Sequence, residues 1–112
     1  MPLRIPAACL CLLAALAGCG RRGAARIEPA PTVLGANVAR GKIVYRMQCA
    51  ACHGEGGTAG QIGPSLQNEN RRHGYRWVYA TVADPAPPMP KLYPSRMTQA
   101  DVRDVSAYVE TL

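Results

Sequence analysis

Two cysteines and a histidine stand close together near the middle of the chain, as Cys49-Ala50-Ala51-Cys52-His53. Residues three apart in a helix lie on the same face, so the two thiols can reach the same side of a ligand. The spacing C-x-x-C-H is typical of haem attachment, in which each thiol adds to one vinyl group of the porphyrin. The histidine that follows is then placed to offer a ring nitrogen to the iron.

Two other kinds of site use closely spaced cysteines. A thioredoxin-type redox pair requires a βαβ unit, and the sequence shows no alternation of strands and helices. A zinc site requires a second pair of ligands, whereas the remaining cysteines are Cys9, Cys11 and Cys19, none of them near a histidine. Haem attachment is therefore the favoured interpretation of the motif.

The first 18 residues have the composition of an export signal. Arg4 gives a positive start, and the 13 residues 5–17 form an apolar run that is too short to span a bilayer. The run leads into L-A-G before Cys19, which resembles a bacterial lipobox, where the cysteine is acylated and becomes the first mature residue. An ordinary cleavage site that leaves Cys19 as a free thiol is the alternative, but such a thiol is a liability in an exported protein.

We therefore expect three segments: a lipoprotein signal peptide at residues 1–18, a flexible tether from lipidated Cys19 over residues 19–35, and a folded domain over residues 36–112. The tether carries three arginines and two prolines and has no hydrophobic period. The arginines either lie on anionic lipid head groups or keep the linker soluble. No Asp follows Cys19, which in the lipoprotein resemblance favours the outer over the inner membrane for this exported, periplasm-facing protein.

The chain is small and basic, with 112 residues, 13 Lys and Arg, 7 Asp and Glu, and a formal net charge of +6. Loss of residues 1–18 removes Arg4 and no acidic residue, which leaves 12 basic and 7 acidic side chains and a net charge of +5. This charge favours partners with acidic surface patches, and we expect redox proteins and no nucleic acid. With one Trp and no Phe the apolar core is thin, so we expect haem to complete it.

A helix is predicted just before the motif, over residues 37–48. Asn37 is a suitable N-cap. Gly41 in the helix interior costs about 1 kcal/mol relative to Ala, and close approach by another helix would explain it. Tyr45, four residues on, lies on the same face as that glycine.

A second helix is predicted at the end of the sequence. Thr98 can cap it, and Asp101 stands where a capping box places Glu, which makes this box a weaker variant. One apolar stripe follows, formed by Val102, Val105, Val109 and Leu112.

Together these features resemble class I cytochrome c over residues 36–112. In that family the first helix carries a small residue and an aromatic before C-x-x-C-H, as at Gly41 and Tyr45, and both pack against the last helix. The A-Y-V at residues 107–109 is similar to the family's closing A-Y-L. The resemblance implies an all-α fold of three to four short helices around one covalently bound haem c, with long loops.

The resemblance also implies a pocket. Residues 63–66 match the family's G-P-x-L, in which the Pro64 carbonyl accepts a hydrogen bond from His53. Met89 matches the family's M-P pair, within a proline-rich strap at residues 85–90, and is implied as the sixth ligand of the iron. Other candidates for that position are Met47, Met97 and His73. The residues expected around the haem are Gly63, Pro64, Leu66 and Trp77.

A short helix predicted over residues 75–82 directs Trp77, with Val78 and Val82, toward the haem. Arg71 and Arg72 either reach a haem propionate together with Trp77 or are solvated surface residues.

An iron ligated by both His53 and Met89 has no open position for a substrate, which describes an electron carrier and not an enzyme. We expect a membrane-tethered, single-haem cytochrome that carries one electron between respiratory or periplasmic redox partners, with no small-molecule substrate. Two alternatives are a haem subunit of a larger oxidoreductase complex and a ligand-sensing or peroxidatic haem protein with a labile sixth ligand.

Overall fold

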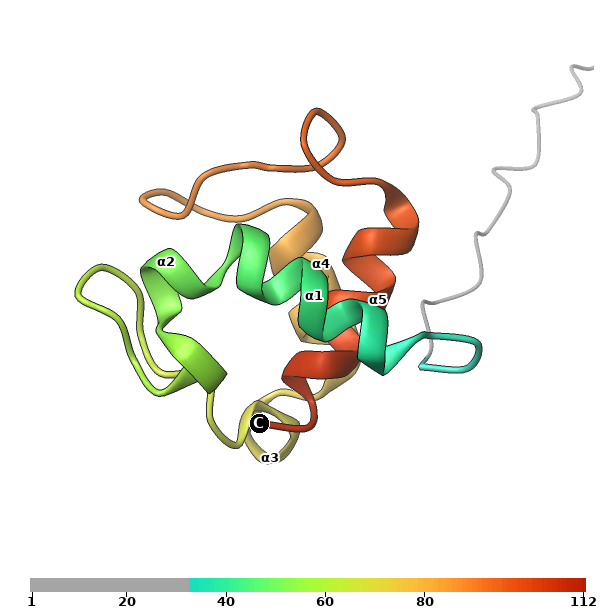
Figure 1. The fold of residues 1–112 in the computed structure, drawn as a ribbon, viewed down its shortest axis with the longest axis horizontal. Coiled ribbons are helices and arrows are strands. Elements are labelled where there is room, and N and C mark those ends of the chain that lie inside the picture. Colours follow the sequence, from blue (N-terminus) through green and yellow to red (C-terminus); the bar gives the residue numbers. More distant parts are fainter. Residues whose placement is uncertain (1–32) are drawn as a thin grey trace, which may run out of the picture.

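The structure is a computed structural model that describes residues 33–112. Within these residues all regular structure is helical, which confirms the predicted all-α class (Figure 1). The helices are α1 (Val38–Gln48), α2 (Ala50–His53), α3 (Glu69–Arg72), α4 (Tyr75–Ala83) and α5 (Gln99–Val109), with a 3₁₀ turn at Glu55–Gly57. Because α2 and α3 are single turns, three longer helices carry the fold. The expected signal peptide, Cys19 and most of the tether lie outside the described residues.

The first helix, α1, begins at its predicted cap. The Asn37 side chain accepts a hydrogen bond from the Arg40 N–H at 2.9 Å, which satisfies one of the free donors of the first turn. At the other end, the Cys49 N–H donates to the Tyr45 carbonyl at 2.8 Å. Cys49 is the C-cap of α1, so the helix ends at the first cysteine. The rest of the motif forms the separate turn α2.

The last helix, α5, begins with the predicted capping box. Thr98 Oγ1 accepts from the Asp101 N–H at 3.2 Å, and the Asp101 carboxylate accepts from the Thr98 N–H at 2.7 Å. Three residues of the predicted apolar stripe face the core, since Val102, Val105 and Val109 each expose 3% or less of their surface. The fourth, Leu112, lies beyond the end of α5 and packs partly buried against the core. Local capping and burial of one face therefore both support this helix.

α1 and α5 cross at Gly41. A Cβ at this position would lie 2.0 Å from the Asp104 carbonyl oxygen and 3.0 Å from Tyr108 Cβ, so the backbones can approach this closely only at a glycine. One turn further along, Tyr45 is fully buried, with its ring centroid 5.3 Å from that of Tyr108. The expectation that Gly41 and Tyr45 pack against the last helix is confirmed.

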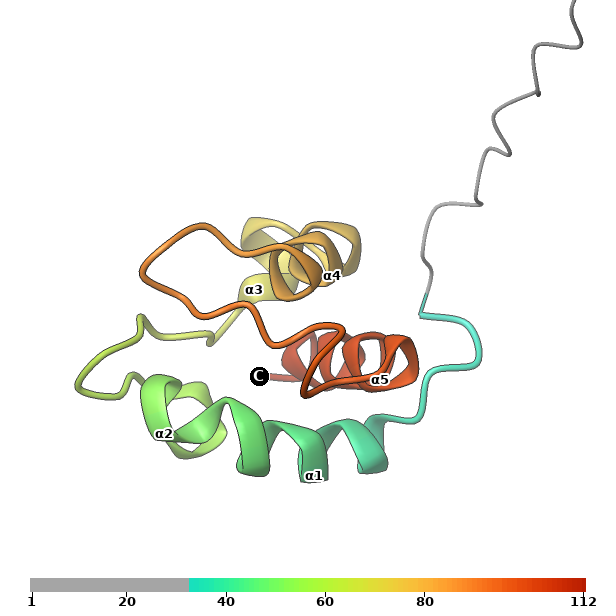
Figure 2. The ribbon, with the colours of Figure 1, turned by 90° about the horizontal axis from the view of Figure 1, so that it is seen from above.

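α5 lies between the other two long helices and contacts both α1 and α4 (Figure 2). The buried core is formed by Tyr45, Val78, Met97, Val102, Val105 and Val109. α1 and α5 have 11 residues each, and none of the helices between residues 33 and 112 has the length and apolar character needed to cross a bilayer. Long irregular segments join α2 to α3 and α4 to α5 (Figure 1). Residues of both segments line the cavity described next.

Candidate haem site

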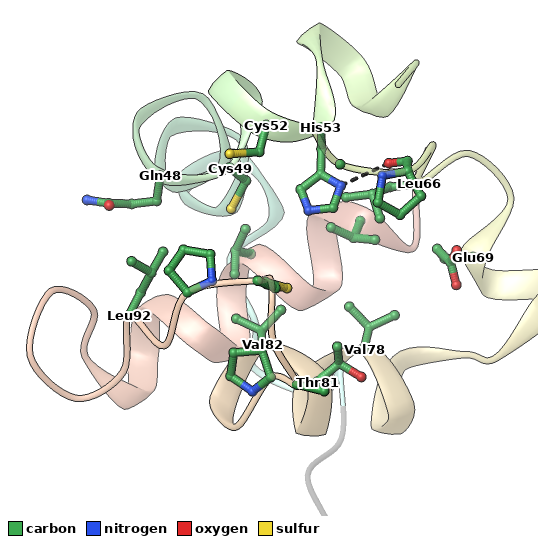
Figure 3. Close-up of a pocket in the computed structure, with 18 of the residues that line it drawn as sticks. Gln48, Cys49, Cys52, His53, Leu66, Glu69, Val78, Thr81, Val82 and Leu92 are labelled. Atoms are coloured by element: carbon green, nitrogen blue, oxygen red, sulfur yellow. Dashed lines mark hydrogen bonds between the residues drawn. The ribbon is translucent and has the colours of Figure 1, made fainter. Parts of the chain in front are cut away.

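A cavity of about 320 Å³ opens between α2, α4 and the strap at residues 85–90. Figure 3 shows the His53 ring and the two thiols on one side of this space, and Val78, Thr81 and Val82 of α4 on the other. Most of the lining side chains are apolar, and cavities of this size and character commonly bind flat organic ligands or cofactors.

Cys49 and Cys52 line this cavity as free thiols. Burial, and then the neighbouring Cys52, raises the pKa of Cys49 to about 11. A thiol with a raised pKa is a poor redox nucleophile, which argues against a thioredoxin-type pair. Within residues 33–112 no three His, Cys, Asp or Glu side chains are arranged to hold a metal ion.

The His53 ring is buried, and a hydrogen bond to the backbone of Pro64 fixes its orientation. Its Nδ1 lies 2.9 Å from the Pro64 carbonyl oxygen, and because a carbonyl only accepts hydrogen bonds, Nδ1 carries the proton. Nε2 is then left unprotonated, with a lone pair available to a metal. This is the contact that the resemblance implies for Pro64, and second partners of this kind fix the orientation of ligating histidines.

Gly63 allows the backbone to approach this ring. A Cβ at position 63 would lie 2.7 Å from His53 Nδ1 and 2.9 Å from the Cys52 carbonyl oxygen. A larger residue would therefore displace either the imidazole or the loop that anchors it. Leu66, the last residue of the G-P-x-L match, also lines the cavity.

Of the four candidates for the sixth ligand, Met89 and Met97 line the cavity, whereas Met47 and His73 do not. Met47 is 74% exposed on α1. Met97 is 2% exposed and belongs to the buried core. Met89 is half-buried in the strap, where four prolines restrict the backbone.

Trp77 lies at the rim of the cavity. It is among the lining residues, yet 47% of its surface is exposed. Its ring stacks on His73, with centroids 3.9 Å apart and 15° between the planes. The two side chains therefore form a stacked pair beside the cavity.

Glu69 on α3 is a cavity residue that sequence reasoning missed. It exposes only 6% of its surface, and its carboxylate binds Arg72 and, at 2.8 Å, Nδ1 of His73. A signal was present, since Glu69, His73 and Trp77 are spaced four residues apart, as on one helix face. Gly74, which separates α3 from α4, concealed that regularity.

The residues present fit a haem. Two thiols and an imidazole meet at one wall of an apolar cavity, and the far nitrogen of the imidazole is anchored by Pro64. The opposite walls offer aliphatic side chains and a thioether. This donor set is that of a c-type haem site.

Comparisons with known proteins lead to the same class. A family model described as cytochrome c oxidase, cbb3-type, subunit III matches residues 36–109. A cytochrome c-553-like protein from Synechocystis sp. is 35% identical over 74 residues, which are 65% of this chain and 67% of that protein. The cytochrome bc1 complex cytochrome c subunit of Corynebacterium diphtheriae is 30% identical over 81 residues, which are 68% of this chain and 27% of that protein.

Among solved structures, cytochrome cL from Methylophaga aminisulfidivorans has a similar fold. The TM-score is 0.54 at 18% identity, and the match covers 66% of this chain and 53% of that cytochrome. The present chain thus spans about half of that protein and about a quarter of the bc1 subunit. The family match over residues 36–109 and the Synechocystis relative show that this chain belongs to the cytochrome c family, whose members hold a covalently bound haem c and carry electrons.

Proposed function

We propose that this chain is a membrane-tethered, single-haem electron carrier, in which Cys49 and Cys52 hold the haem and His53 and Met89 ligate its iron. The observation that carries the proposal is that one apolar cavity is lined by all four residues. When bound, the haem supplies an iron that gains or loses one electron at a time.

The side chains around the iron then determine how readily it accepts an electron. The hydrogen bond from Nδ1 to Pro64 makes His53 a stronger and better-oriented ligand. A thioether from Met89 favours the reduced iron, so the potential is higher than with two histidines. Ligation by both His53 and Met89 would leave no position on the iron for a substrate, and the apolar walls of the cavity would keep water away from it.

We further propose that Cys19 is lipidated and anchors the exported domain to a membrane, with the outer membrane favoured. The apolar run at residues 5–17 and the L-A-G before Cys19 support this. Each buried methylene contributes about 0.8 kcal/mol, so several acyl chains anchor a protein firmly. The net charge of +5 without residues 1–18 suits redox partners with acidic surfaces.

The ligand assignment is tested by replacing each cavity methionine in turn. The ferric protein should show the weak long-wavelength absorption band of methionine-ligated haem, and Met89→Ala should abolish it. Met97→Ala is the control, which should lower stability by about 2–5 kcal/mol and keep the band, because Met97 is a core residue. A band that survives Met89→Ala, or a high-spin wild-type protein that binds carbon monoxide readily, would overturn the assignment.

A second candidate function is a haem subunit of a larger oxidoreductase. It is favoured by the family description and by the similarity to a subunit of a bc1 complex. Purification from detergent-solubilised membranes separates the two: a carrier is recovered alone, whereas a subunit is recovered with stoichiometric partners.

A further inference from the structure

Glu69 brings a carboxylate to the wall of the haem cavity. Among the described residues that line the cavity it is the only acidic one, and its side chain is 8% exposed. Figure 3 shows it at the edge of the cavity, on the same side as Leu66. A buried charge interacts with other charges far more strongly than a solvated one, because little water screens it.

Two basic side chains hold this carboxylate from the outside. Arg72 binds Oε1 of Glu69 and also donates to the Ser65 carbonyl at 3.1 Å, while Nδ1 of His73 lies 2.8 Å from Oε2. Both partners reach solvent, with side chains 49% and 41% exposed. The carboxylate of this cluster therefore lies at the cavity wall, and its basic groups reach the solvent.

Glu110, directly after α5, is a second carboxyl group that interacts with Glu69, and it supplies no positive charge to offset that of Glu69. Its Oε1 is buried without a hydrogen-bond partner among the described residues. Burial raises the pKa of Glu110, the Tyr75 N–H opposes this, and Glu69 adds to the rise. Glu69 therefore acts on Glu110 as a negative charge.

We propose that Glu69 lowers the reduction potential of the haem, because its negative charge stabilises the oxidised, more positive form. Arg72 partly offsets this effect. Glu69 acts on the iron through space and does not ligate it. The inference rests on the haem site proposed above and is independent of the membrane anchor.

Three substitutions and a spectroelectrochemical titration of the holoprotein test this role. Glu69→Gln removes the charge at nearly constant size, and we expect the ratio of reduced to oxidised protein at a fixed potential to rise about tenfold, which is about 59 mV for one electron. Glu69→Asp keeps the charge and should stay near the wild-type potential. Arg72→Gln removes the offsetting charge and should move the potential in the opposite direction, downward.

The matched control is Glu55→Gln, an identical change at an exposed residue that does not line the cavity. It should leave the potential nearly unchanged, because solvent screens its charge. An unchanged or lowered potential in Glu69→Gln, or equal shifts in Glu69→Gln and Glu69→Asp, would overturn the proposal in favour of a packing role. The methionine band is recorded for every variant, so that a wrong assignment of Met89 is recognised separately.

Discussion

Asp104 places a carboxylate inside the crossing of α1 and α5, where it is 1% exposed. Three donors surround it: the Asn37 N–H at 3.0 Å, Arg40 Nη1 at 2.7 Å and Arg103 Nε at 3.0 Å. Burial alone would raise its pKa, but these hydrogen bonds and the charge of Arg103 outweigh it and hold the pKa of Asp104 below its ordinary value.

The resulting stability should depend on pH. Since the pKa is lower in the folded than in the unfolded protein, Asp104 stabilises the fold above the unfolded pKa, and this contribution is lost as the pH falls through the folded pKa. Asp104→Asn should therefore lower the free energy of unfolding at pH 7 by about 1–3 kcal/mol. The difference from wild type should narrow in acid, as measured by urea unfolding at pH 7 and pH 3.

An exposed aspartate provides the comparison. Asp84 pairs with Lys91 at the surface, with its side chain 79% exposed, so Asp84→Asn should change stability by less than about 1 kcal/mol. A gap between wild type and Asp104→Asn that is the same at both pH values would show that the charge is not the source of the stability.

At the scale of the elements, backbone atoms and not long side chains limit how closely α1 and α5 approach each other. The atoms that a Cβ at Gly41 would meet first are the carbonyl oxygen and carbon of Asp104, at 2.0 and 2.5 Å. Backbone atoms of a helix cannot move aside individually, so the two helices would have to separate.

Gly41→Ala should therefore destabilise the protein by about 3 kcal/mol, despite the better helix propensity of alanine. The measurement is the free energy of unfolding of the holoprotein in denaturant. Lys42→Ala, at the exposed next position, is the control and should stay within about 0.5 kcal/mol of wild type. Equal stability of Gly41→Ala and wild type would mean that the crossing is looser than described.

Features that depend on residues close together in the sequence could be predicted, whereas features that depend on long-range contacts could not. α1 and α5 were predictable because Asn37 and Thr98 are local caps and the stripe on α5 repeats at the helical period. α3 was not, because four residues are too few to show a period. The motif identified Cys49, Cys52 and His53, but the approach of Glu69 to the cavity depends on the fold of a loop, which no short pattern encodes.

At the scale of the whole molecule, the hydrophobic core is small, and a cavity lies where a larger core would have side chains. Among the described residues the core cluster has six buried members, and four of them, Val78, Met97, Val105 and Val109, also line the cavity. A small domain of this kind gains about 3–5 kcal/mol from its own core, so the bound haem must contribute a large part of its stability.

The protein without haem should thus be largely unfolded. A Cys49→Ala, Cys52→Ala double variant, shown by mass to lack haem, should give the amide circular dichroism of a mostly disordered chain. Ala51→Ser changes an exposed residue of the same turn, keeps both thiols and should remain helical. A native-like spectrum with cooperative unfolding in the double variant would refute this dependence.

The crossing at Gly41 also determines the order in which the fold can form, because it joins the first long helix to the last. Asn37 and Asp104, which meet there, are 67 residues apart in sequence. At about 5–20 residues per second, roughly 3–13 s separate their synthesis. During that interval Tyr45 has no helix to pack against, and the neighbouring cysteines remain accessible. A chain that emerges from its N-terminus onward thus carries exposed thiols before α5 is available to pack against α1.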